Sequence, residues 1–297
     1  MSFRVFLLAA LAAVLLTGCG SNGDSEAQQM ADGHQGDTPT ATDATRAPEI
    51  PITTKTVSYT QTPDGDAVEG YLAAPERPDS VLSAHGRDPS SAHLPGIVVI
   101  HEWWGLNDNI RAATRRLAGQ GYRALAVDLY RGATASSPDS AQALTKSALS
   151  RRDQLMANLR AAHDHLRSEA EAPQVAVLGW CFGGSRTFDT VAAAPTRYDA
   201  AVAYYGSPEP VTASVLDTLT TPVLAHFGRQ DEVVSMKAVR GFQSRLETAD
   251  ATVQVHLYDA GHAFANPSGE SYDREAAGEA WSRTTKFLRT HLYPERP

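Results

Sequence analysis

Residues 175–184 read VAVLGWCFGG, the most informative stretch of this sequence. Its first four residues are apolar, as in a strand that is buried on both faces of a parallel sheet. A Gly-x-Cys-x-Gly segment follows at once, with Cys181 at its centre. Such a segment after a strand is typical of a nucleophile elbow, a sharp strand-to-helix turn that strains the backbone of the nucleophile. Gly179 and Gly183 have no Cβ, so strand and helix can approach closely.

Residues 185–194 are expected to form a helix that starts just after Cys181. The N-terminus of a helix carries partial positive charge and free N–H groups. Those groups favour a thiolate and also stabilise a developing oxyanion. The alternative is a buried structural cysteine in a tight turn, because free cysteines are often buried. The flanking glycines and the partner residues described below favour the nucleophile.

From residue 49 onward, short β-rich runs alternate with helical stretches. Such alternation predicts the α/β class, with a mostly parallel sheet and helices on both faces. An opening hairpin makes the sheet mixed. Residues 78–95 are polar and proline-bounded and are expected to form a surface insertion. The expected strands are 52–61, 67–74, 96–101, 122–127, 174–179, 199–205, 222–227 and 252–258, and the expected helices are 107–120, 140–170 in two pieces, 185–194, 235–248 and 271–292.

A nucleophile needs a base, and the base needs a group that orients it. Asp231 and His262 each follow a predicted strand, at the edge where α/β sheets carry their sites. The chain order Cys181, Asp231, His262 is the order of nucleophile, acid and base in α/β hydrolases. Each residue also has an ordinary explanation, since Asp231 is placed to cap the next helix and His262 is one of ten histidines. Asp259 is a rival acid, ranked lower because it ends the strand itself.

The loop His-Glu-Trp-Trp-Gly, residues 101–105, follows the first apolar strand. In α/β hydrolases the loop at this place donates an N–H to the oxyanion hole. We expect the backbone N–H groups of Trp103 and Phe182 to form that hole. Glu102 is unusual, because a carboxylate beside the nucleophile disfavours a thiolate unless it takes part in proton transfer.

Composition restricts the partners. The chain has 297 residues, and its 42% hydrophobic and 20% charged content is that of an ordinary globular protein. Its formal net charge is −8, so nucleic acid is not an expected partner. Metal binding fits poorly, because no His-x-x-x-His or Cys-x-x-Cys spacing occurs, and no cofactor is expected. The two cysteines, Cys19 and Cys181, are assigned separate roles, so no disulfide is expected.

The N-terminus has the pattern of a processing signal. Residues 1–18 combine a short basic segment with an apolar run too short for a comfortable membrane span. Residues 16–19, Leu-Thr-Gly-Cys, resemble the lipobox of bacterial lipoproteins, which implies cleavage before Cys19 and acylation of that cysteine. The alternative is an ordinary secretory signal with a chance cysteine. The resemblance implies a lipid-anchored protein of the cell envelope, in the outer membrane on the periplasmic side if the organism is Gram-negative.

Residues 19–48 are expected to be the lipidated cysteine followed by a disordered tether. Residues 20–48 contain no aromatic residue and no Val, Ile or Leu, so they have little apolar surface to bury. A flexible chain of this length reaches about 30 Å. The remaining residues, 49–297, are expected to form one domain.

Several motifs together resemble the dienelactone hydrolase family of the α/β-hydrolase superfamily. They are Gly-x-Cys-x-Gly-Gly, His-Glu-Trp-Trp-Gly, Asp-Leu-Tyr at 128–130, Ala-Tyr-Tyr-Gly at 203–206, and the pair Asp231 and His262. The resemblance covers roughly residues 52–292. It implies an α/β-hydrolase fold without a large lid domain. It also implies hydrolysis of a carboxylic ester or enol-lactone through a cysteine thioester acyl-enzyme, as in carboxymethylenebutenolidase.

The resemblance also implies a role for each site residue. Glu102 accepts the proton of the Cys181 thiol when substrate binds, and Asp231 orients His262. His262 then protonates the leaving oxygen and activates the water that hydrolyses the acyl-enzyme. The implied partner is a small ester or lactone, and the catalytic domain is expected to be monomeric.

The sequence departs from the family where dienelactone hydrolases bind the substrate carboxylate with two arginines. Arg131 lies one position early for the first, and Asn266 stands where the second is expected. Arg131, Tyr205 and Trp104 are candidates for substrate contacts, although the two aromatic residues fit packing equally well. Two further function classes remain open: a catalytically weak binding lipoprotein on a hydrolase scaffold, and a thiol acyltransferase that uses the same acyl-enzyme.

Overall fold

A computed structural model describes residues 22–34 and 47–294. An eight-stranded sheet forms its centre, with strand order β1-β2-β4-β3-β5-β6-β7-β8. β2 pairs antiparallel with β1 and β4, and every neighbouring pair from β4 to β8 is parallel. The predicted mixed, mostly parallel sheet is confirmed. The strands are β1 Ile52–Gln61, β2 Ala67–Pro75, β3 Gly96–Ile100, β4 Arg123–Ala126, β5 Val175–Trp180, β6 Ala200–Tyr204, β7 Val223–Gly228 and β8 Val253–Tyr258.

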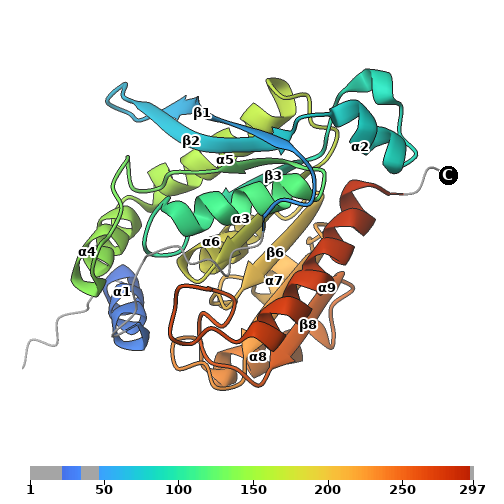
Figure 1. Cartoon of the computed structure of the whole chain (residues 1–297). Helices are drawn as coiled ribbons and strands as arrows, with labels where there is room; N and C mark the ends of the chain where they lie inside the picture. The colour runs from blue at the N-terminus through green and yellow to red at the C-terminus, as the bar shows by residue number, and fades with distance from the viewer. Residues whose placement is uncertain (1–21, 35–46, 295–297) are drawn as a thin grey trace, which may run out of the picture.

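Helices cover both faces of this sheet (Figure 1). α3 and α9 pack on one face, and α5 and α6 pack on the other. α8 lies on the α6 side, where Phe242 meets the ring of Phe188 at a centroid distance of 5.6 Å. The helices are α1 Asn22–Gly33, α2 Pro78–Ala84, α3 Asp108–Gly119, α4 Pro138–Leu149, α5 Arg152–Ser168, α6 Phe182–Ala193, α7 Ala213–Leu216, α8 Met236–Leu246 and α9 Arg274–Leu292.

Local sequence explains where three of the helices begin. The side chains of Asn107, Ser235 and Asp273 accept a hydrogen bond from the backbone N–H three residues later, at the starts of α3, α8 and α9. Such caps satisfy donors that have no partner inside the helix. The central strands β3, β5, β6 and β7 are buried along their whole length, which explains their continuous apolar sequences.

The N-terminal segment differs from the expected tether. Residues Asn22–Gly33 form helix α1, which packs against α4 (Figure 1). Ala27 and Met30 are buried, because their spacing of three places them on one face of the helix. The segment lacks Val, Ile and Leu, but alanine and methionine supply enough apolar surface for docking. Cys19 lies outside the described residues, and none of the described helices has the length and apolar character to cross a membrane.

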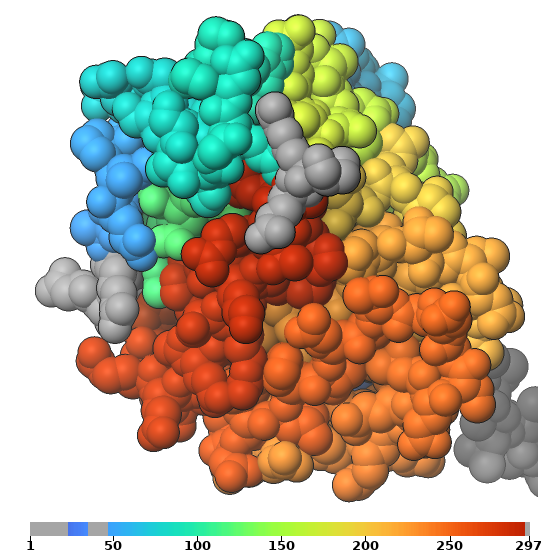
Figure 2. Space-filling model, turned by 90° about the vertical axis from the view of Figure 1, so that its right-hand side faces the viewer, coloured from blue at the N-terminus to red at the C-terminus, as the bar shows by residue number. Residues whose placement is uncertain are grey.

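The proline-bounded insertion lies on the surface, as predicted, and is partly helical. It contains α2 and a single 3-10 turn, η1 Pro89–Ser91. His85 stacks on Tyr293 at the end of α9, with a ring separation of 3.8 Å. Figure 2 shows this segment, in teal, above the red C-terminal helix. The insertion therefore packs on the C-terminal end of α9.

The elbow between β5 and α6 is a tight crossing of strand and helix. Cys181 has φ 53°, in the left-handed region that non-glycine residues rarely adopt. A Cβ on Gly179 would collide with the backbone of Gly183, and a Cβ on Gly183 would collide with the carbonyl of Ile100. These glycines allow the strand and the helix to meet with Cys181 at the turn.

Gly179→Ala is expected to destabilise the fold by about 1–3 kcal/mol, as overpacking in a tight core does. The colliding atoms belong to the backbone of α6, so β5 and α6 must move apart. Gly278→Ala is the matched control, because Gly278 is exposed in α9 and its added Cβ meets nothing within 4 Å. That helix substitution is expected to stabilise by about 0.5–1 kcal/mol. Urea unfolding measures the stability of both variants. Equal stabilities would contradict the close contact between β5 and α6.

Candidate active site

The candidate residues meet at the carboxyl edge of the parallel strands. Glu102 follows β3, Cys181 follows β5, Asp231 follows β7 and His262 follows β8. Because parallel strands end at the same edge, loops that are far apart in the sequence meet there. The structure thus brings together the four residues that the sequence proposes as catalytic.

Cys181 is a free thiol, and the residue is 2% exposed. Burial raises the pKa of the thiol well above its usual range, and the negative charge of Glu102 raises it further. The N–H of Phe182 donates to the sulfur and acts in the opposite direction, lowering the pKa. The helix start thus acts in the expected direction, towards the thiolate. Burial and the nearby carboxylate outweigh it, so the thiol of Cys181 is protonated at neutral pH.

Asp231 fixes the orientation of His262. Its Oδ2 lies 2.8 Å from Nδ1 of His262, while its Oδ1 accepts from the N–H groups of Val233 and Val234 at 2.8 and 2.7 Å. The Nδ1 bond directs Nε2 away from Asp231, and Nε2 is buried without a hydrogen-bond partner in the described part of the chain. A ring nitrogen of His262 lies within 4.8 Å of the Cys181 sulfur. This is the geometry of an oriented base beside a nucleophile.

The rival acid, Asp259, takes no part in this arrangement. Its side chain is 84% exposed and forms an ion pair with Arg229 at 3.1 Å. The side chain of Asp231 is instead fully buried against His262. The structure therefore pairs the histidine with Asp231.

Glu102 is held by two neighbours inside the site. Its Oε2 accepts from Nδ2 of Asn266 at 2.7 Å, and its Oε1 accepts from the hydroxyl of Tyr205 at 3.4 Å. Burial and the charge of Glu102 raise the pKa of the Tyr205 phenol, so the hydroxyl remains a donor. Asn266 is itself oriented, because its Oδ1 accepts from the N–H of Ser268 at 2.9 Å. The residue that replaces an expected arginine thus orients Glu102, a role that sequence reasoning missed.

His101 fixes the backbone that carries Glu102. Its Nδ1 lies 2.5 Å from the Glu102 carbonyl, and its Nε2 accepts from the N–H of Leu129 at 3.2 Å. Burial lowers the pKa of His101, so the ring is neutral and donates from Nδ1 only. The loop after β3 is thereby tied to the loop after β4.

Comparison with known proteins identifies the family of the chain. Residues 82–292 match the dienelactone hydrolase family. The chain belongs to the dienelactone hydrolase family. The resemblance drawn from the motifs is confirmed, and so is the α/β-hydrolase fold.

Relatives span most of the chain of this hydrolase. A protein of Escherichia coli strain K12, provisionally named carboxymethylenebutenolidase, is 31% identical over 264 residues and covers 78% of this chain and 90% of its own. Protein usf of Aquifex pyrophilus is 30% identical over 237 residues, covering 77% and 96%. Among solved structures, a Klebsiella pneumoniae protein provisionally named dienelactone hydrolase has a TM-score of 0.66 at 28% identity and covers 80% and 98%.

Two aromatic residues that were candidates for substrate contacts, Trp104 and Tyr205, lie in different surroundings. Trp104 is 1% exposed and packs against Trp103, with ring centroids 4.9 Å apart. Its carbonyl accepts from the N–H of Ala135 at 3.0 Å, so its place is structural. Tyr205 instead lines a cavity beside Glu102. Other residues that line this cavity are Arg116, Trp180, Asn266 and Arg274.

Arg131 does not lie with the catalytic residues. Its guanidinium donates to Gln154 at 2.8 Å and lies 4.0 Å from the carboxylate of Asp64 in the β1–β2 hairpin. The carboxylate of Asp128 accepts from the N–H groups of Tyr130 and Gly132, which folds this loop into a turn. The turn directs Arg131 toward the hairpin, and its contact with substrate stays a prediction.

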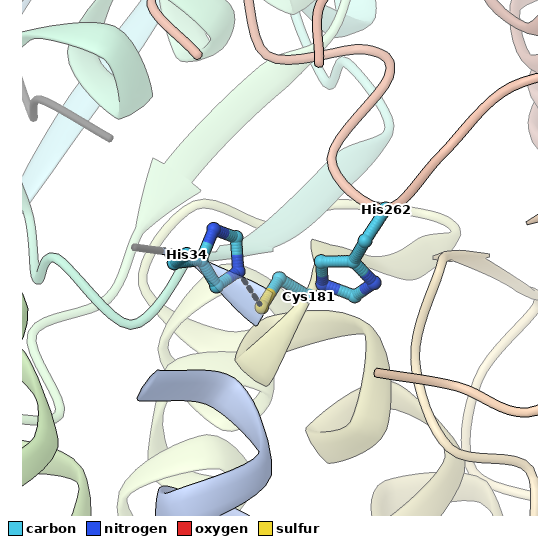
Figure 3. A group of neighbouring side chains, drawn as sticks. All are labelled: His34, Cys181 and His262. Carbon is cyan, nitrogen blue, oxygen red and sulfur yellow. Dashed lines mark hydrogen bonds between the residues drawn. The ribbon is translucent and has the colours of Figure 1, made fainter. Parts of the chain in front are cut away.

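His34 is a site residue that sequence reasoning missed. It follows α1, is 3% exposed, and its Nε2 lies 3.5 Å from the Cys181 sulfur. Its ring stacks on Trp103 at 4.8 Å and meets the ring of His262 edge-on at 5.0 Å. Figure 3 shows the sulfur between the two imidazoles. The segment carries no local signal for this contact, which depends on how α1 docks.

The protonation state of Cys181 is open to measurement. In a Cys19→Ala chain, Cys181 is the only thiol. Because its pKa is raised, the thiolate fraction and the rate of iodoacetamide alkylation are expected to increase about tenfold per pH unit from about pH 6 to pH 9. Glu102→Gln removes a charge that raises the pKa, so it is expected to speed alkylation at neutral pH.

N-acetylcysteine is the reference in this experiment, since its rate levels off near the ordinary thiol pKa. A rate for Cys181 that is already constant with pH below pH 8 would mean a resting thiolate and would contradict the assignment.

Proposed function

We propose that this protein hydrolyses a carboxylic ester or enol-lactone through a cysteine thioester acyl-enzyme. The observation that carries the proposal is the arrangement of His262. Nδ1 of His262 is hydrogen-bonded to Asp231, and Nε2 has no partner among the described residues. A ring nitrogen of His262 lies within 4.8 Å of the Cys181 sulfur. A base so oriented accepts and returns protons at a nucleophile.

The buried thiol needs an acceptor for its proton during attack. Glu102 supplies one, because its carboxylate is fixed inside the site by Asn266 and Tyr205. As the bond between sulfur and the acyl carbon forms, the proton leaves the thiol for Glu102 and passes to His262. His262 then gives that proton to the leaving oxygen as the carbon–oxygen bond breaks. The product is an alcohol or enol, and the enzyme carries a thioester.

Deacylation returns the enzyme to its resting state. His262 takes a proton from water, and the resulting hydroxide adds to the thioester carbonyl. The carbon–sulfur bond then breaks, the acid leaves, and the proton returns to the sulfur of Cys181. In both steps the oxyanion is stabilised by N–H groups, for which Phe182 is supported by its contact with the sulfur. The backbone N–H of Trp103 is the proposed second donor.

We further propose that Cys19 is lipidated and anchors the protein in the cell envelope, in the outer membrane of a Gram-negative cell. The support is the Leu-Thr-Gly-Cys segment at residues 16–19 after an apolar run. Helix α1 begins at Asn22, three residues after Cys19. Three residues span at most about 10 Å, so a docked α1 holds the catalytic domain against the lipid surface. The domain is proposed to act there as a monomer on a small ester or lactone.

Substitutions in the triad are expected to remove turnover of a chromogenic ester such as p-nitrophenyl acetate. Cys181→Ala is expected to lower kcat/KM by about 10⁴-fold or more, because no acyl-enzyme forms. Asp231→Asn is expected to lower it by about 10²–10⁴-fold, because His262 loses its orientation. Asp259→Asn is the matched control, since Asp259 is exposed and pairs with Arg229, and it is expected to retain activity.

The Glu102→Gln variant distinguishes two effects of the carboxylate: it raises the pKa of the thiol, and it accepts the thiol proton during turnover. Turnover is expected to fall, because the thiol loses its proton acceptor, while alkylation of Cys181 speeds up. Rapid-quench mass spectrometry of the wild type is expected to detect a thioester on Cys181. Full activity of Cys181→Ala, or equal losses in Asp231→Asn and Asp259→Asn, would refute the mechanism.

The lipid anchor is tested independently of catalysis. Expressed in a Gram-negative host, the full-length chain is expected in the membrane fraction, and Cys19→Ala is expected in the soluble fraction. Cys181→Ala is the control for the loss of a cysteine as such, and it is expected to remain with the membrane. Equal fractionation of the chain and Cys19→Ala would contradict lipidation at this residue.

A further inference from the structure

The side chains of His34, Cys181 and His262 converge on one point (Figure 3). One candidate ligand atom from each residue, a ring nitrogen or the sulfur, lies within 4.8 Å of the other two. All three residues are at least nine-tenths buried. The catalytic reaction described above uses Cys181 and His262 and gives no role to His34.

The position of His34 is supported by contacts along the whole of α1. Glu26 forms an ion pair with Arg186 of α6 at 2.8 Å, and the side chain of Arg186 is only 3% exposed. Asp24 pairs with Lys146 of α4 at 2.8 Å. Met30 is buried in the core between these contacts and His34. A helix fixed on two neighbours therefore delivers the imidazole to the sulfur.

We propose that His34, Cys181 and His262 form a binding site for a divalent transition metal of the zinc type. One thiolate and two imidazoles are a ligand set that zinc prefers, and three protein ligands leave a fourth position for water. Only one consequence rests on the proposed function: a metal bound to Cys181 blocks the nucleophile and stops ester turnover. Binding itself does not depend on that function.

The distances fit a tetrahedral ion after a small adjustment. Ligand atoms around zinc lie roughly 3.3–3.6 Å apart, from Zn–N bonds of about 2.0 Å and Zn–S bonds of about 2.3 Å. The separation between His34 Nε2 and the sulfur is already 3.5 Å. Since no separation exceeds 4.8 Å, side-chain movements of about 1 Å complete the geometry.

The surroundings of the three ligands favour a cation. Nε2 of His262 is buried without a hydrogen-bond partner among the described residues, which leaves its lone pair for a metal. Asp231 accepts from the opposite ring nitrogen at 2.8 Å, the carboxylate–histidine arrangement that supports many zinc ligands. Glu102, also buried, adds a second negative charge nearby. On binding, the thiol proton passes to solvent, a metal–sulfur bond forms, and nothing is oxidised or reduced.

The sequence gives no spacing motif for this site, because the ligands come from three separated segments. His34 and Cys181 are 147 positions apart and meet only when α1 docks. The expectation of no metal site rested on the absence of closely spaced ligands.

Cobalt(II) is the probe that tests the site, because its absorption reports thiolate ligation and tetrahedral geometry. Co²⁺ added to a Cys19→Ala chain is expected to give a sulfur-to-cobalt charge-transfer band and intense visible bands, both displaced by one equivalent of Zn²⁺. His34→Ala is expected to weaken binding by about 100-fold or more, beyond the loss typical of an outer-shell partner. His93→Ala is the matched control, since this exposed histidine pairs with Glu171 and is expected to bind cobalt normally.

His34→Gln keeps a side chain of similar size in case the alanine variant folds poorly, and it is expected to lose the same affinity. Absence of a charge-transfer band in the Cys19→Ala chain, or unchanged affinity in both His34 variants, would overturn the site. Zn²⁺ is also expected to inhibit ester turnover reversibly, with release by EDTA. If no ester is turned over by any chain, the proposed function fails, while the cobalt spectra still decide the metal site.

Discussion

The crossing of β5 and α6 at Cys181 is the constraint on which the site depends. Two glycines let the backbones meet where any Cβ would collide, and Cys181 takes up the turn with a positive φ. Around the sulfur lie Glu102, Asp231 and His262, from the loops after β3, β7 and β8. The same crossing buries the thiol, which raises its pKa. One local constraint thus positions the Cys181 thiol and also keeps it protonated.

The polar residues around the thiol are each held by a second contact. Asp231 is fixed by two backbone N–H groups before it orients His262. Glu102 is fixed by Asn266 and Tyr205, and its backbone carbonyl lies 2.5 Å from Nδ1 of His101. Buried polar groups without such partners would cost several kcal/mol. Nε2 of His262 is unpartnered among the described residues, which is the observation behind both the proposed proton transfer and the proposed metal site.

Helix α1 makes part of the N-terminal segment a docked element of the site. A flexible tether would leave the mouth of the site open, whereas the docked helix places an imidazole 3.5 Å from the nucleophile. The helix has a narrow apolar face, so its docking depends on paired charges as well as on Ala27 and Met30. The exposed pair of Asp24 and Lys146 contributes modestly and weakens with salt, whereas Glu26 pairs with the buried side chain of Arg186.

The sequence alone predicts the fold class, the strands in their chain order, and the strand-end positions of Cys181, Asp231, His262 and Glu102, because alternating periodicity and strand-end motifs are local signals. It does not predict helix α1. The other features come from the tertiary fold. Burial keeps the Cys181 sulfur protonated, and Asn266, which stands where the family has an arginine, is the partner of Glu102. A turn directed Arg131 to the hairpin, and α1 brought His34 to the sulfur. Each of these depends on contacts between distant segments, which no local pattern encodes.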